Sequence, residues 1–127
     1  MIIVPTVGKN KDLALIFASN LFLRLFSNDI TPSIADTLGS YTEVTGGGYA
    51  EKTLTGGSWT ISNGIATYAS QLFTFTGTTG GSGQVYGYYV VDGAGVVRFA
   101  ERFSESQIPY TVINGSTIRI NPRYQIN

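Results

Sequence analysis

The chain contains no histidine and no cysteine among its 127 residues. Without histidine, Ser-His-Asp and Cys-His catalytic arrangements and imidazole metal sites are excluded. Without cysteine, disulfide frameworks and thiolate metal sites are excluded, and the composition suits folding in a reducing compartment such as the cytoplasm. Any enzyme chemistry would therefore have to use carboxylates.

Charged residues are also scarce. They make up 13% of the chain, against a usual share of about 25%, while apolar residues make up 43%. Eight Lys and Arg residues balance eight Asp and Glu residues, so the formal net charge is zero. Nucleic-acid binding draws on clustered cations, and here they are scattered. We therefore expect no nucleic-acid partner, and the low charge indicates that a protein partner covers part of the surface.

Long hydrophobic runs are missing as well. The apolar segment at 13–26 is interrupted by Ser19, Asn20 and Arg24 and falls short of the ~20 residues that span a bilayer. Residues 1–5 are apolar but too short for a secretory signal and have no basic region before them. We expect no membrane partner.

What the chain does contain is short alternating segments bounded by turn residues. Two strands within residues 84–103, rich in Val, Tyr and Phe, flank a turn at Asp92-Gly93. Asn63-Gly64 and Asn114-Gly115 predict two further hairpins, since Asn-Gly is a strong hairpin signal. These hairpins would join the segments 58–62 with 65–69 and 110–113 with 117–121.

Further strands are expected at 21–27, 49–55 and 72–76, a glycine-rich surface loop at 77–83, and an edge strand or tail at 123–127 after Pro122. About eight short strands predict a mostly β fold, an antiparallel β-sandwich or barrel-like body. At this length, residues 1–127 are expected to form a single domain.

The N-terminal region is expected to differ from this body. Residues 1–9 read as an extended arm, and 11–19 as a short helix capped by Asn10 or Asp12. One helical face would carry Leu13, Ile16, Phe17 and Asn20. The alternation that follows predicts a strand, although one helix running through to residue 26 stays open as the alternative.

The acidic residue of greatest interest is Glu101. It shares strand parity with Val97, Phe99 and Phe103, so alternation turns it toward the apolar face. A carboxylate there needs a partner or acquires a raised pKa. We expect a structural ion pair with Arg24, Arg98 or Arg102, or else a contact with another subunit.

Other carboxylate functions stay as alternatives. A hydrolase could combine Glu101 with Glu43 or Glu51, and Asp29, Asp36, Asp92 and Glu43 could supply oxygen ligands to calcium. The spacing of these acids does not match a calcium loop, and turn formation accounts for Asp29 and Asp92. We therefore predict no catalytic residue, no metal and no cofactor.

Aromatic residues are plentiful, and Tyr86, Tyr88, Tyr89, Trp59 and Tyr68 offer ring faces for subunit packing or sugar stacking. In a β protein such residues also form cross-strand pairs in the core. Both uses are expected in this chain.

Three pieces of the sequence resemble small virion structural proteins of tailed bacteriophages, including those that infect cyanobacteria. They are the alternating strand and turn at 21–32, the segment 41–50 with Ser58-Trp59 after it, and 85–92 leading into 99–103. The resemblance spans residues 9–121. It implies a non-enzymatic cement or decoration protein of the capsid, located in the virion and assembled in the host cytoplasm.

The partner implied is the major capsid protein or another virion protein, bound by a homo-oligomer (dimer or trimer). The contact is expected to use apolar residues of the arm, exposed tyrosines, and arginines that set the register. The expected interface residues are Ile2, Ile3, Val4, Val7, Tyr86, Tyr88, Arg98, Arg102 and Arg119. A tail or fibre component that binds a receptor or glycan is the alternative.

Overall fold

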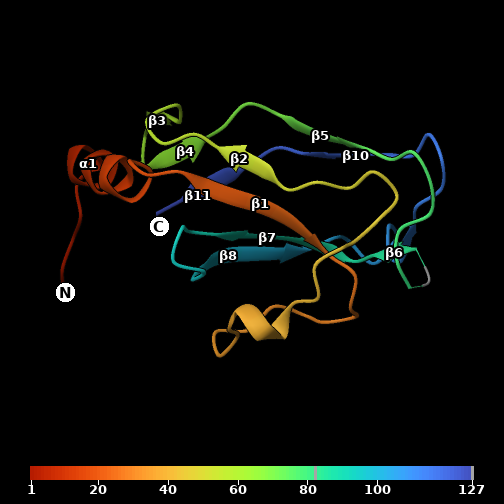
Figure 1. Ribbon diagram of the computed structural model, residues 1–127. Helices are drawn as coiled ribbons and strands as arrows, with labels where there is room; N and C mark the ends of the chain where they lie inside the picture. Colours follow the sequence, from red (N-terminus) through yellow and green to blue (C-terminus); the bar gives the residue numbers. More distant parts are fainter. Residues whose placement is uncertain (82, 127) are drawn as a thin grey trace.

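The computed structural model describes residues 1–81 and 83–126 and confirms a mostly β fold (Figure 1). Over this part of the chain it contains one α-helix, one 3-10 helix and eleven strands, all paired antiparallel. The elements are α1 (Thr6–Ile16), β1 (Leu21–Phe26), η1 (Leu38–Ser40), β2 (Lys52–Leu54), β3 (Thr60–Ser62), β4 (Ile65–Thr67), β5 (Gln71–Thr74), β6 (Gln84–Val85), β7 (Gly87–Val91), β8 (Val97–Arg102), β9 (Tyr110–Thr111), β10 (Thr117–Ile120) and β11 (Arg123–Gln125).

The largest sheet has four strands in the order β2-β1-β7-β8. In β1, Leu21, Leu23 and Leu25 are buried on one face, as the predicted alternation requires. Residues 21–26 are therefore a strand, and the alternative of one helix running through to residue 26 is wrong. Because β1 lies between β2 and β7, its backbone is paired on both sides.

The main core lies on the leucine face of this sheet. Opposite it stand the pair β10-β5 and the three-stranded sheet β11-β4-β3 (Figure 1). Both layers contribute fully or nearly fully buried side chains, for example Leu23 and Val90 from one and Phe73 and Ile120 from the other. A short pair, β6-β9, closes one end. The layers thus share one apolar interior.

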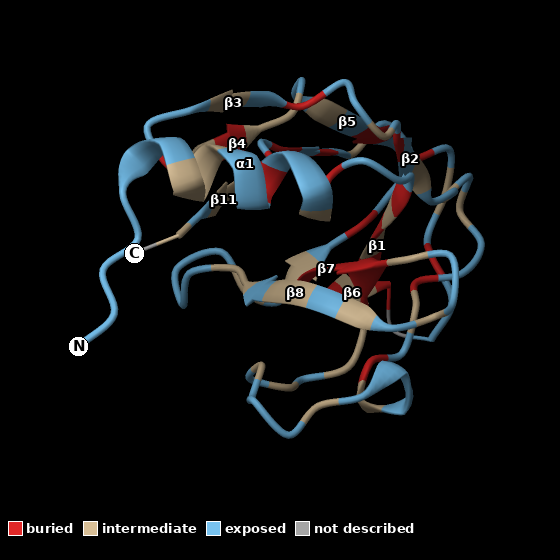
Figure 2. Ribbon diagram, turned by 90° about the vertical axis from the view of Figure 1, so that its left-hand side faces the viewer, coloured by how far each residue is buried: buried red, intermediate tan, exposed pale blue. Residues whose placement is uncertain are grey.

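The opposite face of the four-stranded sheet has a smaller core of its own. The segment 27–41, which includes η1, passes beneath it (Figures 1 and 2). Tyr41 from this segment stacks on Tyr89 with ring centroids 4.9 Å apart, and both pack with Phe26 and Val91. Both faces of β1 and β7 are therefore covered, which explains why all five residues of β7 are buried.

The N-terminal helix begins earlier than predicted, since α1 spans Thr6–Ile16 and not 11–19. Pro5 occupies the N-cap in an extended conformation, and no side chain caps the helix, so the sequence lacks the usual start signal. Asn10, predicted as a cap, instead accepts a hydrogen bond from the backbone N–H of Gly64. The extended arm is therefore 1–5.

The predicted apolar face of the helix is largely correct. Leu13 and Phe17 are 0% and 1% exposed, and Ile16 is half-buried against the same core. Asn20 lies beyond the helix and accepts a hydrogen bond from the Gly56 N–H. The spacing thus identified the buried face although the helix boundaries were wrong.

Two of the three predicted hairpins are confirmed. Asn63 and Gly64 have φ of 54° and 74° and join β3 to β4, as an Asn-Gly turn requires. The β7–β8 hairpin also forms, with a bulge between Val90 and Val91.

The third predicted hairpin is wrong. The turn at Asn114-Gly115 exists, because the Ser116 N–H bonds to the Ile113 carbonyl, but the segments beside it do not pair with each other. β10 pairs with β5, which sets Ile118 opposite Phe73 with both side chains buried, and β9 pairs with β6. The partner of β10 is decided by burial of its side chains in the main core. A turn signal between neighbouring segments carries no information about that burial.

Other boundaries shift by a few residues. The strand predicted at 49–55 is reduced to β2, Lys52–Leu54. The three residues before Tyr49, 46–48, have positive φ and are not extended. The Leu25 N–H donates to the side-chain hydroxyl of Tyr49, so this part of β1 does not continue the backbone ladder with β2. The predicted edge strand after Pro122 is confirmed as β11 at the edge of its sheet. Of the predicted loop 77–83 and tail 123–127, residues 82 and 127 lie outside the described residues.

Gly87 lies where β7 packs closely between β1 and β8. A Cβ atom there would collide with the carbonyl oxygen of Glu101 and the ring of Phe26. Gly87→Ala is expected to lower the free energy of unfolding by at least about 2 kcal/mol, because a tightly packed strand cannot move aside at little cost. Urea unfolding followed by circular dichroism measures this.

The matched control is Gly93→Ala in the β7–β8 turn, where an added Cβ meets open space. Its free energy of unfolding should stay within about 0.5 kcal/mol of the parent chain. Equal effects of the two substitutions would contradict the packing described around Gly87.

Candidate interaction surfaces

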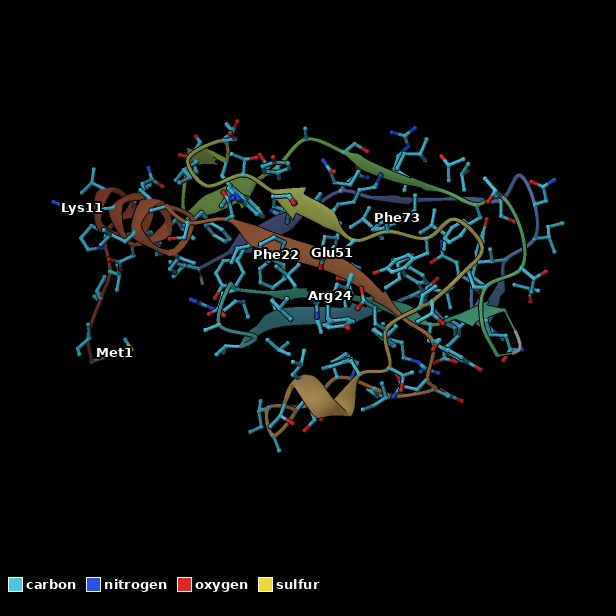
Figure 3. The ribbon with its side chains drawn as sticks, viewed as in Figure 1. Met1, Lys11, Phe22, Arg24, Glu51 and Phe73 are labelled. Carbon is cyan, nitrogen blue, oxygen red and sulfur yellow. The ribbon has the colours of Figure 1, made fainter. Side chains whose placement is uncertain are left out.

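The N-terminal arm projects from the body (Figures 1 and 3). Ile2 and Ile3 are 90% and 77% exposed, and Val4 is 38% exposed. Val7, in the first turn of α1, is 79% exposed. These four predicted interface residues therefore lie together in one uncovered apolar segment.

Tyr86 and Arg102, also predicted for the interface, meet each other. The Arg102 guanidinium lies over the Tyr86 ring, 5.4 Å from its centroid. It also pairs with the Asp29 carboxylate and donates to the Ile30 carbonyl at 3.0 Å. Both side chains are half-buried. Through these contacts Arg102 attaches the loop at 28–30 to the sheet.

The other three predicted interface residues are Tyr88, Arg98 and Arg119. Tyr88 is only 8% exposed and belongs to the main core, so little of it is available to a partner. Burial and the nearby Glu101 carboxylate raise the pKa of its hydroxyl to about 12. Arg98 pairs with Asp92 at 3.4 Å, and Arg119 donates to the Ser70 hydroxyl at 3.0 Å. The nine residues do not form one continuous surface.

The expected ion pair of Glu101 is wrong. Its carboxylate makes no salt bridge within residues 1–81 and 83–126, and each candidate arginine has other acidic partners. Glu101 shares a face with Phe99 and Phe103, which pack on the main core, but Val97 packs on the other side because of the bulge. Glu101 itself is exposed at the border of that core.

Arg24 and two glutamates form a charged cluster that the sequence analysis did not predict (Figure 3). Its Nε lies 2.8 Å from Glu51 and 3.7 Å from Glu43, and these partners raise its pKa, the hydrogen bond to Glu51 most. Glu43 also accepts a hydrogen bond from the Tyr49 hydroxyl at 2.8 Å, and burial and this bond raise the pKa of Tyr49. Strand alternation correctly predicted that Arg24 lies on the face of β1 opposite the leucines. Its two acidic partners could not be predicted in this way, because both lie outside the strands.

This cluster bears on the hydrolase hypothesis. Arg24 faces the same side as Tyr89, whereas Glu101 pairs across strands with Tyr88 and faces the other side. Glu43 and Glu51 therefore lie across the four-stranded sheet from Glu101. The structure does not bring together the carboxylates that such a mechanism would need.

The aromatic rings are mostly committed to packing. Trp59 is 7% exposed, with its ring centroid 4.1 Å from Phe17 and 5.2 Å from Tyr68. Tyr89 is 1% exposed. Of the tyrosines considered for sugar stacking, Tyr86 and Tyr68 stay half-buried. Trp59 and Tyr89 are therefore core residues and are not open to a ligand.

The acids considered for calcium are engaged elsewhere. Asp36 accepts from the Tyr41 hydroxyl and the Ser33 N–H, and Asp92 accepts from the N–H groups of Ala94 and Val96. Over the described ranges, no three acidic side chains come close enough to hold a metal ion. In the same ranges no helix is long and apolar enough to cross a bilayer.

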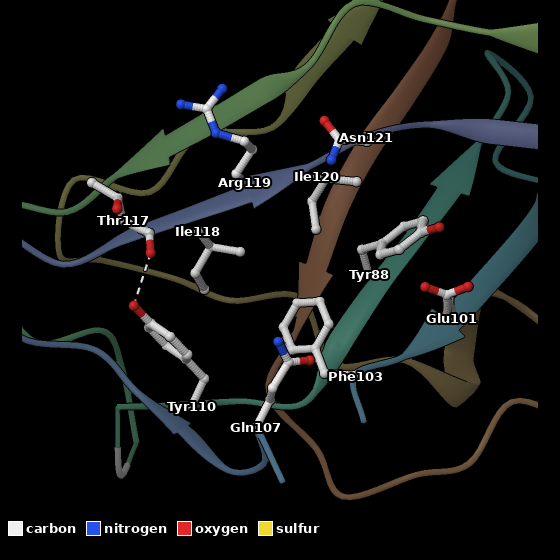
Figure 4. Close-up of a pocket in the computed structure, with 10 residues that line it drawn as sticks. All are labelled: Tyr88, Glu101, Phe103, Gln107, Tyr110, Thr117, Ile118, Arg119, Ile120 and Asn121. Carbon is white, nitrogen blue, oxygen red and sulfur yellow. Dashed lines mark hydrogen bonds between the residues drawn. The ribbon is translucent and has the colours of Figure 1, made fainter. Parts of the chain in front are cut away.

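A cavity of 350 Å³ opens on the side of the body where β8 and β10 lie (Figure 4). It was not foreseen, although Tyr88 and Glu101 were singled out separately. The hydroxyl of Tyr110 donates to the Thr117 carbonyl at 2.8 Å and holds one wall in place. The lining residues are Tyr88, Glu101, Phe103, Gln107, Tyr110, Thr117, Ile118, Arg119, Ile120 and Asn121.

Comparisons with models of known families, with curated proteins and with solved structures found no significant match for this chain.

Arg102 should stabilise the segment 27–41 measurably. Arg102→Met is expected to lower the free energy of unfolding by about 1–3 kcal/mol, because it removes a charged donor from a half-buried carbonyl and from Asp29. Hydrogen exchange should accelerate in residues 28–36. Arg98→Met, which removes an exposed partner of Asp92, is the control and should change stability by less than about 0.5 kcal/mol. Equal exchange in both variants would contradict this role.

Asp92 should make the β7–β8 turn sensitive to pH. Backbone hydrogen bonds from Val96 and Ala94 and the nearby Arg98 lower its pKa below the ordinary value of 3.8. A lowered pKa in the folded state contributes stability above the ordinary pKa, and that stability is lost as the pH falls through the folded pKa. Asp92→Asn should therefore destabilise the protein near neutral pH, and this effect should disappear as the pH falls through the lowered pKa of Asp92. Urea unfolding at several pH values measures the difference, and a difference independent of pH would contradict the assignment.

Proposed function

We propose that the protein is a non-enzymatic structural protein of a phage virion, most specifically a capsid cement or decoration protein that binds across capsomers. The single observation that carries the proposal is the apolar arm, residues 1–5. Ile2 and Ile3 are uncovered and extended, and an extended segment can add to the sheet edge or groove of a neighbouring subunit.

Two further features support a binding role. The chain has about half the usual share of charged residues. Some of the charges that it has are paired with one another, as Arg24 is with Glu51 and Arg102 is with Asp29. The resemblance of residues 9–121 to small virion proteins of tailed phages supplies the particular kind of partner.

The proposed action is thermodynamic. A protein that binds the assembled shell and not its separated subunits stabilises the shell by mass action. The partner would be the major capsid protein or another virion protein, and the chain would act as a dimer or trimer. Arms from several copies would then reach several capsomers at once.

A test replaces the two exposed isoleucines of the arm. Ile2→Asp with Ile3→Asp is expected to reduce occupancy on purified phage heads at least tenfold, because charged side chains would have to be buried at the contact. Quantitative gel analysis of heads after sedimentation measures the occupancy. The thermal unfolding temperature of the isolated protein should not change, since neither residue packs on the body.

The matched control is Ile34→Asp, an exposed isoleucine in the segment 27–41. It should bind heads like the parent chain. Full occupancy by the arm variant, or equal loss in both variants, would contradict the proposed use of the arm.

A tail or fibre component that binds a receptor or glycan is the second candidate, and the cavity beside Glu101 is the observation that favours it. Antibody labelling of intact particles separates the two: label distributed over the head supports the cement protein, and label confined to the tail supports the second candidate.

A further inference from the structure

The cavity exists because the two layers do not close on one side. β8 and β10 each end the order of strands in their sheets, and they are not paired with each other. Inward-facing side chains of both strands therefore border an opening, with Phe103 following β8 and Ile118 and Ile120 on β10 (Figure 4). A volume of 350 Å³ lies within the range of roughly 300–1,000 Å³ for small-molecule sites.

The floor of this opening is apolar and ordered. Ile118 and Ile120 are 6% and 4% exposed, and Phe103 packs on the same core. Tyr110 is fixed by its hydrogen bond to Thr117. Figure 4 shows the two isoleucines extending from β10 toward the side of the cavity that carries Phe103 and Tyr88. A ligand would therefore meet a ring and aliphatic carbon.

The rim carries polar groups that the described residues leave unused. The Tyr88 hydroxyl, the Glu101 carboxylate and the Asn121 amide make no hydrogen bond to any residue within 1–81 and 83–126. Gln107 accepts from the backbone N–H and the hydroxyl of Ser104, which fixes its oxygen and leaves its two N–H donors free. Donors and acceptors thus line the same cavity as the apolar side chains.

Charge narrows the class of ligand. Glu101 disfavours an anion, and Arg119 does not offset it, because its guanidinium turns away from the cavity and donates to Ser70 (Figure 4). A simple ammonium ion could use the Glu101 carboxylate but would leave the amide donors of Gln107 unused. A neutral hydroxylated ligand uses both kinds of group, since each hydroxyl donates and accepts.

We propose that this cavity binds one neutral hexose unit of a glycan, with the C–H face of the sugar on the Phe103 ring and its hydroxyls on Glu101 and Gln107. The site does not depend on the proposed cement function, because the cavity includes no residue of the arm, and it specifies the ligand of the second candidate, a receptor- or glycan-binding component. A ligand of this size in a half-open site binds with a Kd of about millimolar order.

The test is a nuclear magnetic resonance titration of the full ¹⁵N-labelled chain with the methyl glycosides of glucose, galactose and mannose and with N-acetylglucosamine. At least one of these sugars should cause saturable shifts at the backbone amides of 101–103, 107 and 120–121. Glu101→Gln and Phe103→Leu should each weaken that binding at least fivefold, the first by removing a charged acceptor and the second by removing the ring face.

Two further measurements keep the result interpretable. Thermal unfolding should show that both variants are folded, because Glu101 is exposed and leucine retains apolar volume at 103. Glu105→Gln, which changes an exposed carboxylate outside the cavity, is the matched control and should bind like the parent chain.

The proposal is overturned if none of the four sugars causes saturable shifts, or if the shifts lie away from the cavity. It is also overturned if both cavity variants bind like the control, or if methylammonium chloride saturates the same amides at lower concentration than any of the sugars. The last outcome would identify a cation site.

Discussion

The fold depends on β1 being buried on both of its faces. Leu21, Leu23 and Leu25 pack into the main core, while Phe26 packs with Tyr89 and Tyr41 on the other side. A two-sided strand needs cover on each side, so β5 and β10 lie over one face and the segment 27–41 passes beneath the other. The rest of the architecture follows from this requirement.

The same constraint explains the ionic groups. Arg24 stands on a strand whose other residues are largely buried, and a cation in that setting requires acidic partners. Glu43 and Glu51 supply them from segments before β2. Arg102 similarly joins the sheet to the segment that covers its outer face. Arg102 thereby stabilises the cover of the second face.

Features encoded by neighbouring residues could be predicted from the sequence. The turn at Asn63-Gly64 requires positive φ at two successive residues, and Asn and Gly tolerate it, so the hairpin followed. The leucine alternation in β1 and the buried face of α1 were equally local. The boundaries of α1 were not, because Pro5 at the N-cap replaces the usual polar side chain.

Features that depend on distant segments could not be predicted. β10 pairs with β5 and not across the adjacent turn, and no local pattern specifies that choice. The bulge near Val97 changes the alternation of side chains along β8. Glu101 therefore shares a face with Phe99 and Phe103, as predicted, but not with Val97. The predicted interface residues fell in separate places, since a list of residue types does not fix their positions in space.

The two surfaces proposed to act are physically independent. The arm is a short extended segment outside the core, whereas the cavity is framed by strands that the core holds in place. Attachment through the arm therefore requires no change in the cavity. A protein arranged this way can bind a partner through its arm while the cavity stays accessible to a ligand.

The packing of Trp59 has a practical consequence. It is the only tryptophan in the sequence, its ring lies against Phe17 next to the end of α1, and its indole N–H has no hydrogen-bond partner in the described part of the chain. Indole emission depends on the polarity around the ring, so its wavelength reports whether α1 remains seated. The chain thus carries an intrinsic optical probe beside the element from which its arm extends.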